Sequence, residues 1–76
     1  MTYYPYKVET KEDLQRLSEL ASQEDFNIYI GTNTAMIDAK SILALFTILG
    51  KNVSLVAPDH ADSKKFYKFI DKLNKL

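Results

Sequence analysis

The apolar residues of this chain change their spacing several times, and that change constrains the fold more than any other feature. A spacing of two is typical of a half-buried strand, whereas a spacing of three or four is typical of an amphipathic helix. Strands are predicted at residues 3–9, 26–30, 35–37 and 53–57, and helices at residues 11–22, 41–49 and 62–75. The predicted element order is therefore β-α-β-β-α-β-α.

The second and third predicted strands are close enough in sequence to form a hairpin. Gly31, Thr32 and Asn33 lie between them, and these residue types are typical of tight turns. A central hairpin with helices between the other strands favours an α+β fold, in which three helices cover one face of a four-stranded, mostly antiparallel sheet. The other face of such a sheet meets water, which explains the alternating strands. We expect residues 1–76 to form a single domain.

Length and composition limit how this domain is stabilised and where it works. The chain has 76 residues and no cysteine, so a hydrophobic core must stabilise it without disulfides. The missing cysteines fit a cytoplasmic protein, no apolar run is long enough for a membrane span, and the first residues do not resemble a secretion signal. Since there is one histidine, we expect no metal site and no cofactor.

The charges are balanced overall but unevenly distributed. Residues 1–38 carry seven acidic and three basic side chains, and residues 39–76 carry seven basic and three acidic ones. Most of these lysines fall on the last predicted helix, in a pattern typical of a solvated helix face. We therefore expect neither nucleic acid nor a membrane as a partner.

One segment carries a family resemblance. The residues from Ile37 to Phe46 read Ile-Asp-Ala-Lys-Ser-Ile-Leu-Ala-Leu-Phe and enter a short apolar helix. This segment resembles the stretch leading into the second helix of HPr, the phosphocarrier of the bacterial sugar phosphotransferase system. The element order, the central hairpin and the entry to the last helix are also similar to that family. The resemblance covers nearly the whole chain and implies an HPr-like open-faced sandwich.

The phosphocarrier site of that family is not reproduced. In the family, a histidine between the first strand and the first helix accepts phosphate, and an arginine and the helix N-terminus neutralise it. Alignment from Ser41 without a gap places Thr10 at the histidine position and Glu12 at the arginine position. Glu9, Glu12 and Asp13 crowd this position with negative charge, which repels phosphate. We therefore expect no phosphohistidine transfer there.

The single histidine, His60, follows the last predicted strand and should lie at the opposite end of the domain. It is interpreted as a solvated loop residue, because histidine chemistry needs a positioned partner. The two glycines are far apart, so there is no glycine-rich phosphate loop. We expect no catalytic residues and no enzymatic activity. A phosphocarrier that uses His60 as a relocated acceptor is one alternative.

Ser41 is the residue for which the resemblance implies a function. In HPr of many Gram-positive bacteria this serine is phosphorylated by an ATP-dependent kinase, and the product co-regulates carbon catabolite repression. The catabolite-repression HPr subgroup lacks the active histidine and keeps the serine, as this chain does. A phosphoserine at a helix N-terminus is stabilised by free N–H groups, and Lys40 adds a positive neighbour. The implied partners are an HPr serine kinase and a transcriptional regulator.

Ser41 also has a purely structural reading, as a residue that caps the following helix. That helix is apolar nearly all round, so in a small domain it is either buried or presents an apolar face. By resemblance, a partner-docking surface is formed by Lys40, Ile42, Leu43 and Phe46. The other large residues are then core: Leu45, Ile48 and Leu49. The alternatives are a homodimer interface, plain core, or a degenerate HPr-like self-association module without phosphorylation.

Overall fold

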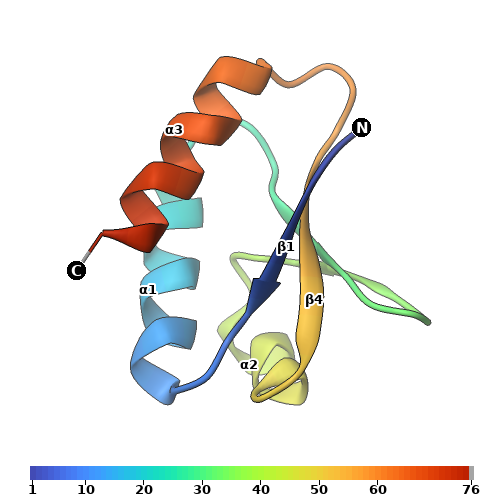
Figure 1. Cartoon of the computed structure of the whole chain (residues 1–76), viewed down its shortest axis with the longest axis vertical. Helices are drawn as coiled ribbons and strands as arrows, with labels where there is room; N and C mark the ends of the chain where they lie inside the picture. The colour runs from blue at the N-terminus through green and yellow to red at the C-terminus, as the bar shows by residue number, and fades with distance from the viewer. Residues whose placement is uncertain (76) are drawn as a thin grey trace.

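The structure is a computed structural model that describes residues 1–75, and Figure 1 shows its elements. Their order, β-α-β-β-α-β-α, is the one that the apolar spacing predicts. The strands are β1 (Thr2–Lys7), β2 (Tyr29–Gly31), β3 (Met36–Asp38) and β4 (Asn52–Ala57). The helices are α1 (Lys11–Ser22), α2 (Ile42–Leu45), the 3-10 turn η1 (Phe46–Ile48) and α3 (Ser63–Asn74).

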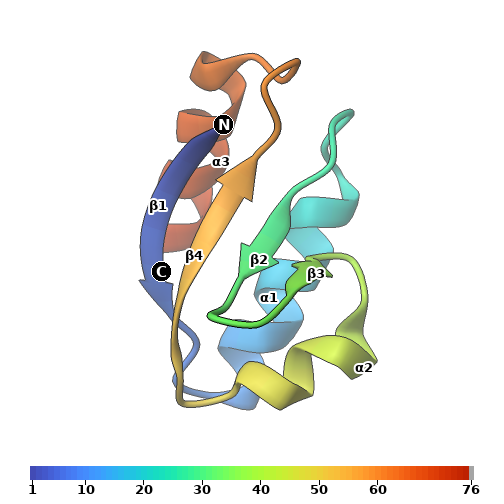
Figure 2. The ribbon, with the colours of Figure 1, turned by 90° about the vertical axis from the view of Figure 1, so that its right-hand side faces the viewer.

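The strands form one sheet in the order β1-β4-β2-β3, and each pair is antiparallel. β4 therefore lies between the first and second strands of the sequence and pairs with both. Figures 1 and 2 show α1 and α3 on one face of this sheet, with α2 at one end of the helical layer. The predicted α+β sandwich with an open sheet face is confirmed.

Both predicted helical stripes face the sheet. The buried residues of the two long helices are Leu14, Leu17 and Ala21 on α1, and Phe66, Phe69, Ile70 and Leu73 on α3. They share one core cluster with the inward members of the strands, such as Ile30 and Leu55, which are paired in register. α3 supplies two aromatic rings to this cluster, Phe66 and Phe69, and such rings bury a large apolar area.

Several predicted segments are shorter in the structure, and α3 loses one residue at each end of its predicted range 62–75. β1 ends at Lys7, and β2 begins at Tyr29 although the apolar alternation starts at residue 26. Ile28 is nevertheless buried, and its carbonyl accepts a hydrogen bond from the Ala39 N–H at 2.9 Å. The helix predicted at residues 41–49 is one turn of α-helix that tightens into η1, a change common at helix ends.

Gly50 follows the end of this segment. Its φ of +80° lies in the left-handed region, which glycine adopts without the clash that a Cβ causes. The Gly50 N–H donates to the Val8 carbonyl at 2.7 Å. This bond joins the turn before β4 to the loop between β1 and α1, so both loops lie at the same end of the domain.

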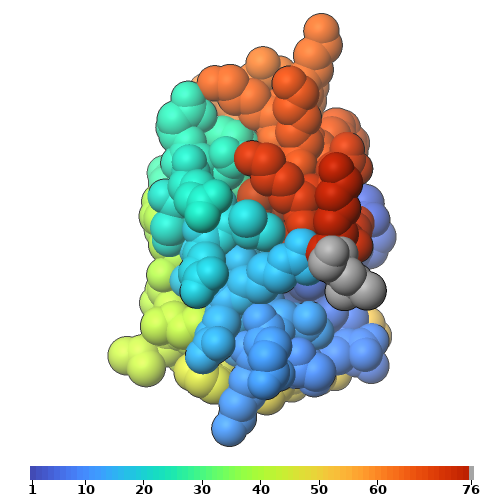
Figure 3. All heavy atoms as spheres, turned by 90° about the vertical axis from the view of Figure 1, so that its left-hand side faces the viewer, coloured from blue at the N-terminus to red at the C-terminus, as the bar shows by residue number. Residues whose placement is uncertain are grey.

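Two polar contacts join the α1 region to α3 at the surface, on the face shown in Figure 3. The Arg16 guanidinium donates to the Lys72 carbonyl, and the Lys65 ammonium lies 2.9 Å from the Asp25 carboxylate. The Lys65 ammonium lowers the pKa of the Asp25 carboxyl below its usual value. Both side chains of that ion pair are largely exposed, so it contributes little to the free energy of unfolding.

Candidate regulatory and docking site

Ser41 lies in a tight turn between β3 and α2. The Ser41 N–H donates to the Asp38 carbonyl at 3.0 Å, and the Lys40 N–H donates to the Asp38 Oδ1 at 2.9 Å. Between them, the Ala39 side chain is completely buried and anchors the turn in the core. The backbone that carries Ser41 is therefore held by the sheet on one side and by the core on the other.

The Ser41 side chain is exposed, and its hydroxyl has no hydrogen-bond partner within residues 1–75. Its backbone is extended (φ −88°, ψ 91°), and its carbonyl accepts from the Leu45 N–H at 3.0 Å. Ser41 thus occupies the N-cap position of α2 through its backbone alone. A side-chain cap of α2 would explain a serine here structurally, but that hydrogen bond is not formed. The hydroxyl is therefore accessible to an approaching reagent.

Lys40 connects this turn by hydrogen bonds to α1 and to the segment between α1 and β2. Its Nζ donates to the Asn27 Oδ1 at 2.9 Å, and its carbonyl accepts from the Ser18 hydroxyl at 3.3 Å. The lysine is exposed and makes no ion pair in the described part of the chain. It therefore supplies a positive charge on the residue next to Ser41, in a turn that also holds the Asp38 carboxylate.

The residues after Ser41 divide between the surface and the core. Leu43 is 80% exposed and Phe46 is 44% exposed, whereas Leu45 and Ile48 are buried. Ile42 and Leu49 are partly buried and pack against the core cluster. We call Ile42, Leu43 and Phe46 the apolar patch. The segment projects at the edge of the helical face in Figure 3, where its yellow-green atoms stand out at the lower left.

Thr10 begins α1 with a capping box. The Asp13 N–H donates to the Thr10 hydroxyl at 3.1 Å, and the Thr10 N–H donates to the Asp13 Oδ2 at 3.3 Å. The first-turn carboxylates, Glu12 and Asp13, lie at the positive end of the helix. These groups occupy the N-terminus that an anion would need, and Glu12 places a negative charge where the resemblance aligns an arginine.

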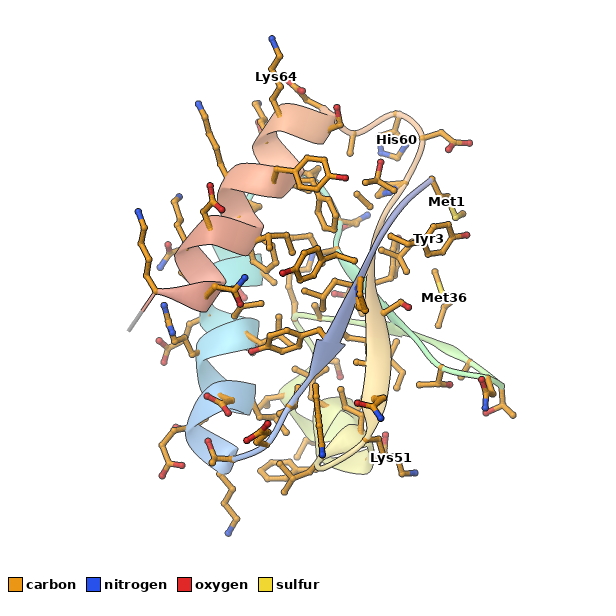
Figure 4. All side chains as sticks on the ribbon, in the orientation of Figure 1. Met1, Tyr3, Met36, Lys51, His60 and Lys64 are labelled. Carbon is orange, nitrogen blue, oxygen red and sulfur yellow. The ribbon has the colours of Figure 1, made fainter. Side chains whose placement is uncertain are left out.

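His60 lies in the exposed loop between β4 and α3. Figure 4 shows it at the end of the domain opposite to Lys51, as the antiparallel pairing of β1 with β4 requires. Thr10 follows β1 and lies at the Lys51 end, so His60 and the start of α1 do not form one site. Within residues 1–75 there is no cluster of metal-ligating side chains and no helix able to cross a membrane.

Comparisons with known proteins identify the fold. The chain superposes on an HPr-C-His protein from Thermoanaerobacter tengcongensis with a TM-score of 0.72 and 17% sequence identity, over 96% of this chain and 91% of that one. It also superposes on the phosphocarrier protein HPr of Bacillus anthracis, with a TM-score of 0.67 and 15% identity, over 95% of this chain and 90% of the other. No protein-family model and no curated protein matches the sequence.

These likenesses define the class of fold. Their coverage is nearly complete in both directions, so the whole domain, and not one motif of it, has the architecture of HPr phosphocarriers. The sequence identity is low enough that the likeness concerns the fold alone. Roles for individual residues therefore depend on the geometry described above.

One surface feature was not indicated by the sequence analysis. The open face of the sheet is hollowed between the β2–β3 hairpin and the start of β4, and Lys51, Asn52 and Ser54 line the hollow. No motif marks these residues. The available signal is that Asn52 and Ser54 are the polar, outward members of an alternating strand.

Thr10 and Ser41 form a matched pair for testing which hydroxyl caps a helix. Because Thr10 makes a side-chain cap bond, Thr10→Ala is expected to lower the free energy of unfolding by about 1 kcal/mol. Ser41→Ala removes no such bond and is expected to change it by less than about 0.5 kcal/mol. Equilibrium urea unfolding measures both values. An equal loss in both variants would mean that the Ser41 hydroxyl caps α2 in solution.

Proposed function

We propose that this protein is an HPr-like regulatory protein, related to the phosphotransferase system, that is phosphorylated on Ser41 and docks protein partners through the apolar patch. The observation that carries the proposal is the exposed, unpartnered Ser41 hydroxyl on a rigid turn in an HPr fold. Lys40 precedes Ser41, and Leu43 and Phe46 are exposed just after it. A modifiable hydroxyl and an apolar contact surface thus lie on one short segment.

A histidine phosphocarrier role has less support. A capping box of the Thr10 hydroxyl and the Asp13 carboxylate closes the start of α1, and Glu12 adds a second carboxylate to its first turn. The only histidine lies at the far end of the domain. We therefore propose that the chain has lost phosphohistidine transfer and acts as the substrate of an enzyme rather than as an enzyme.

The proposed reaction is phosphoryl transfer from ATP by an HPr serine kinase. The Ser41 Oγ attacks the γ-phosphorus, a base of the kinase takes the hydroxyl proton, and ADP leaves. The product carries about −1.5 to −2 additional charges at neutral pH next to Lys40. By resemblance to the catabolite-repression HPr subgroup, the phosphorylated form would bind a transcriptional regulator through the segment that holds Ser41 and the apolar patch.

Intact-mass measurement after incubation with ATP and an HPr serine kinase tests this proposal. We expect one added phosphate on the parent protein and none on Ser41→Ala. Ser63→Ala is the matched control, because Ser63 is an exposed serine at the start of α3, and it should accept phosphate normally. A folded parent protein that gains no phosphate, or a phosphate that persists in Ser41→Ala, would contradict the proposal.

The two alternatives give different results on the same protein. A relocated phosphocarrier would take phosphate from phosphoenolpyruvate, through the upstream enzyme of the system, on His60. A self-association module would show a concentration-dependent dimer in sedimentation with Phe46 protected, and no phosphate from either donor. Either result would replace the regulatory assignment.

A further inference from the structure

The face of the sheet opposite the helices has its own pattern of residues. Register pairs place Tyr3 beside Val56, Gly31 beside Ser54, and Met36 beside Gly31. Successive strand residues point to opposite faces, so these residues are the outward members of their strands. Figures 1 and 2 show no helix over this face, and Figure 4 shows Tyr3 and Met36 projecting on the side away from α3.

This face contains a hollow of about 830 Å³. It is lined by residues of the β2–β3 hairpin turn and by Thr47, Lys51 and Asn52 from η1 and the start of β4. Tyr3 and Met36 border it on the apolar side. The volume lies within the range of about 300 to 1,000 Å³ that small-molecule sites occupy. The hollow is open to solvent, so a ligand would keep part of its surface in water.

Gly31 has no side chain, so the hollow extends down to the backbone at this position. A Cβ added at this position would lie 3.4 Å from Val56 Cγ2 and 3.5 Å from Met36 Sδ, in contact with both. Val56 itself is completely buried beneath the outward side chains, although it does not belong to the core on the helical side. The floor is therefore an apolar surface with one gap in its side-chain layer, at Gly31.

Several of the polar side chains around this floor are unpaired. Within residues 1–75, the side chains of Thr34, Lys51, Asn52 and Ser54 make no hydrogen bond to the protein and no ion pair. Thr32, by contrast, is fully used in the hairpin turn. Among the described residues, no carboxylate lines the hollow, and Lys51 is the only charged residue that does. The hollow thus presents hydroxyls, an amide and a single cation to a ligand.

We propose that this hollow binds a small hydroxylated organic anion, with one carboxylate or phosphate group on a sugar-like carbon skeleton. The Lys51 ammonium would pair with the anionic group, and Thr34, Asn52 and Ser54 would exchange hydrogen bonds with hydroxyls. Tyr3 and Met36 offer an apolar border for the C–H face of such a ligand. This site uses neither Ser41 nor the apolar patch, so it stands independently of the proposed regulatory function.

The test is a titration of the full chain, labelled with ¹⁵N and followed by amide NMR shifts. The probes are gluconate and glucose 6-phosphate, which carry the two sources of anionic charge, with glucose and inorganic phosphate as controls. We expect at least one of the two hydroxylated anions to shift the amides of Gly31, Thr34, Asn52 and Ser54 in a saturable way. Which of them binds more tightly distinguishes a carboxylate ligand from a phosphate ester.

Two charge-matched variants complete the experiment. Lys51→Gln should weaken binding of the anion by about fivefold, as the loss of a largely exposed ion pair predicts. Lys68→Gln removes the same charge from α3 and should leave the affinity unchanged. Absence of shifts with both anions, shifts that follow the lysines of α3, or an equal response to inorganic phosphate alone would overturn the proposal. So would equal affinity of the parent protein and Lys51→Gln.

Discussion

Phe66→Ala is expected to lower the free energy of unfolding by about 3 to 5 kcal/mol, the range for removing a large aromatic side chain from a core. Phe66 is completely buried, and its ring is stacked on that of Phe69, with centroids 6.5 Å apart and an interplanar angle of 17°. A domain of this size has a total stability that begins at about 5 kcal/mol. The variant should therefore be largely unfolded in mild urea, as circular dichroism can show.

Tyr67→Ala is the matched control for this prediction. Tyr67 is the next residue of α3, is also aromatic, and is 50% exposed. Its removal should cost about 1 kcal/mol or less, because about half of the side chain is already in water. If both variants unfolded at the same urea concentration, α3 would not pack on the sheet through the face described here.

The contrast between Phe66 and Tyr67 also shows why the fold could be predicted from the sequence. On α1 and α3 the apolar residues recur at helical spacing with polar residues between them, so each helix has one face that can be buried. The order of these helices among alternating strands then leaves few ways to build a single core. The predicted stripes of both long helices are buried in the structure.

The ends of the elements could not be predicted in the same way. Residues 26–28 alternate as a strand does, but β2 starts at Tyr29, because pairing depends on where a neighbouring strand begins. The segment after Ser41 is apolar on all sides, so spacing alone does not decide which residues face inward. Its short α-helix and 3-10 turn fix that choice, and they leave Leu43 exposed while Leu45 is buried.

The candidate site was predictable only in part. The Lys40-Ser41 pair could be found because a motif carries it. Whether the Ser41 hydroxyl caps α2 depends on one backbone conformation that composition and spacing do not determine. The hollow on the open sheet face depends on how β1, β4 and the hairpin curve around Gly31, and its polar residues come from separate elements. Only their three-dimensional arrangement brings them together.

The division of the α2 segment between core and surface can be tested by placing an aspartate at each of two neighbouring positions in turn. Leu45→Asp is expected to unfold the protein, because a carboxylate at this completely buried site finds no partner and its burial costs several kcal/mol. Phe46→Asp places the same charge on a side chain that is already 44% exposed. That variant should keep its fold, with a loss of about 1 kcal/mol or less. Thermal unfolding followed by circular dichroism distinguishes the two.

Phe46→Asp then tests whether the apolar patch docks a partner. If the HPr serine kinase reaches Ser41 by contacting this patch, the folded variant should be phosphorylated about tenfold more slowly or worse, as expected when a central apolar contact is lost. Tyr67→Ala removes an exposed aromatic ring from α3, outside the patch, and should be phosphorylated at the parent rate. An unchanged rate with Phe46→Asp would contradict docking of the kinase through Phe46. A slower rate with both variants would instead indicate that exposed aromatic surface matters in general, and that the patch next to Ser41 has no special role.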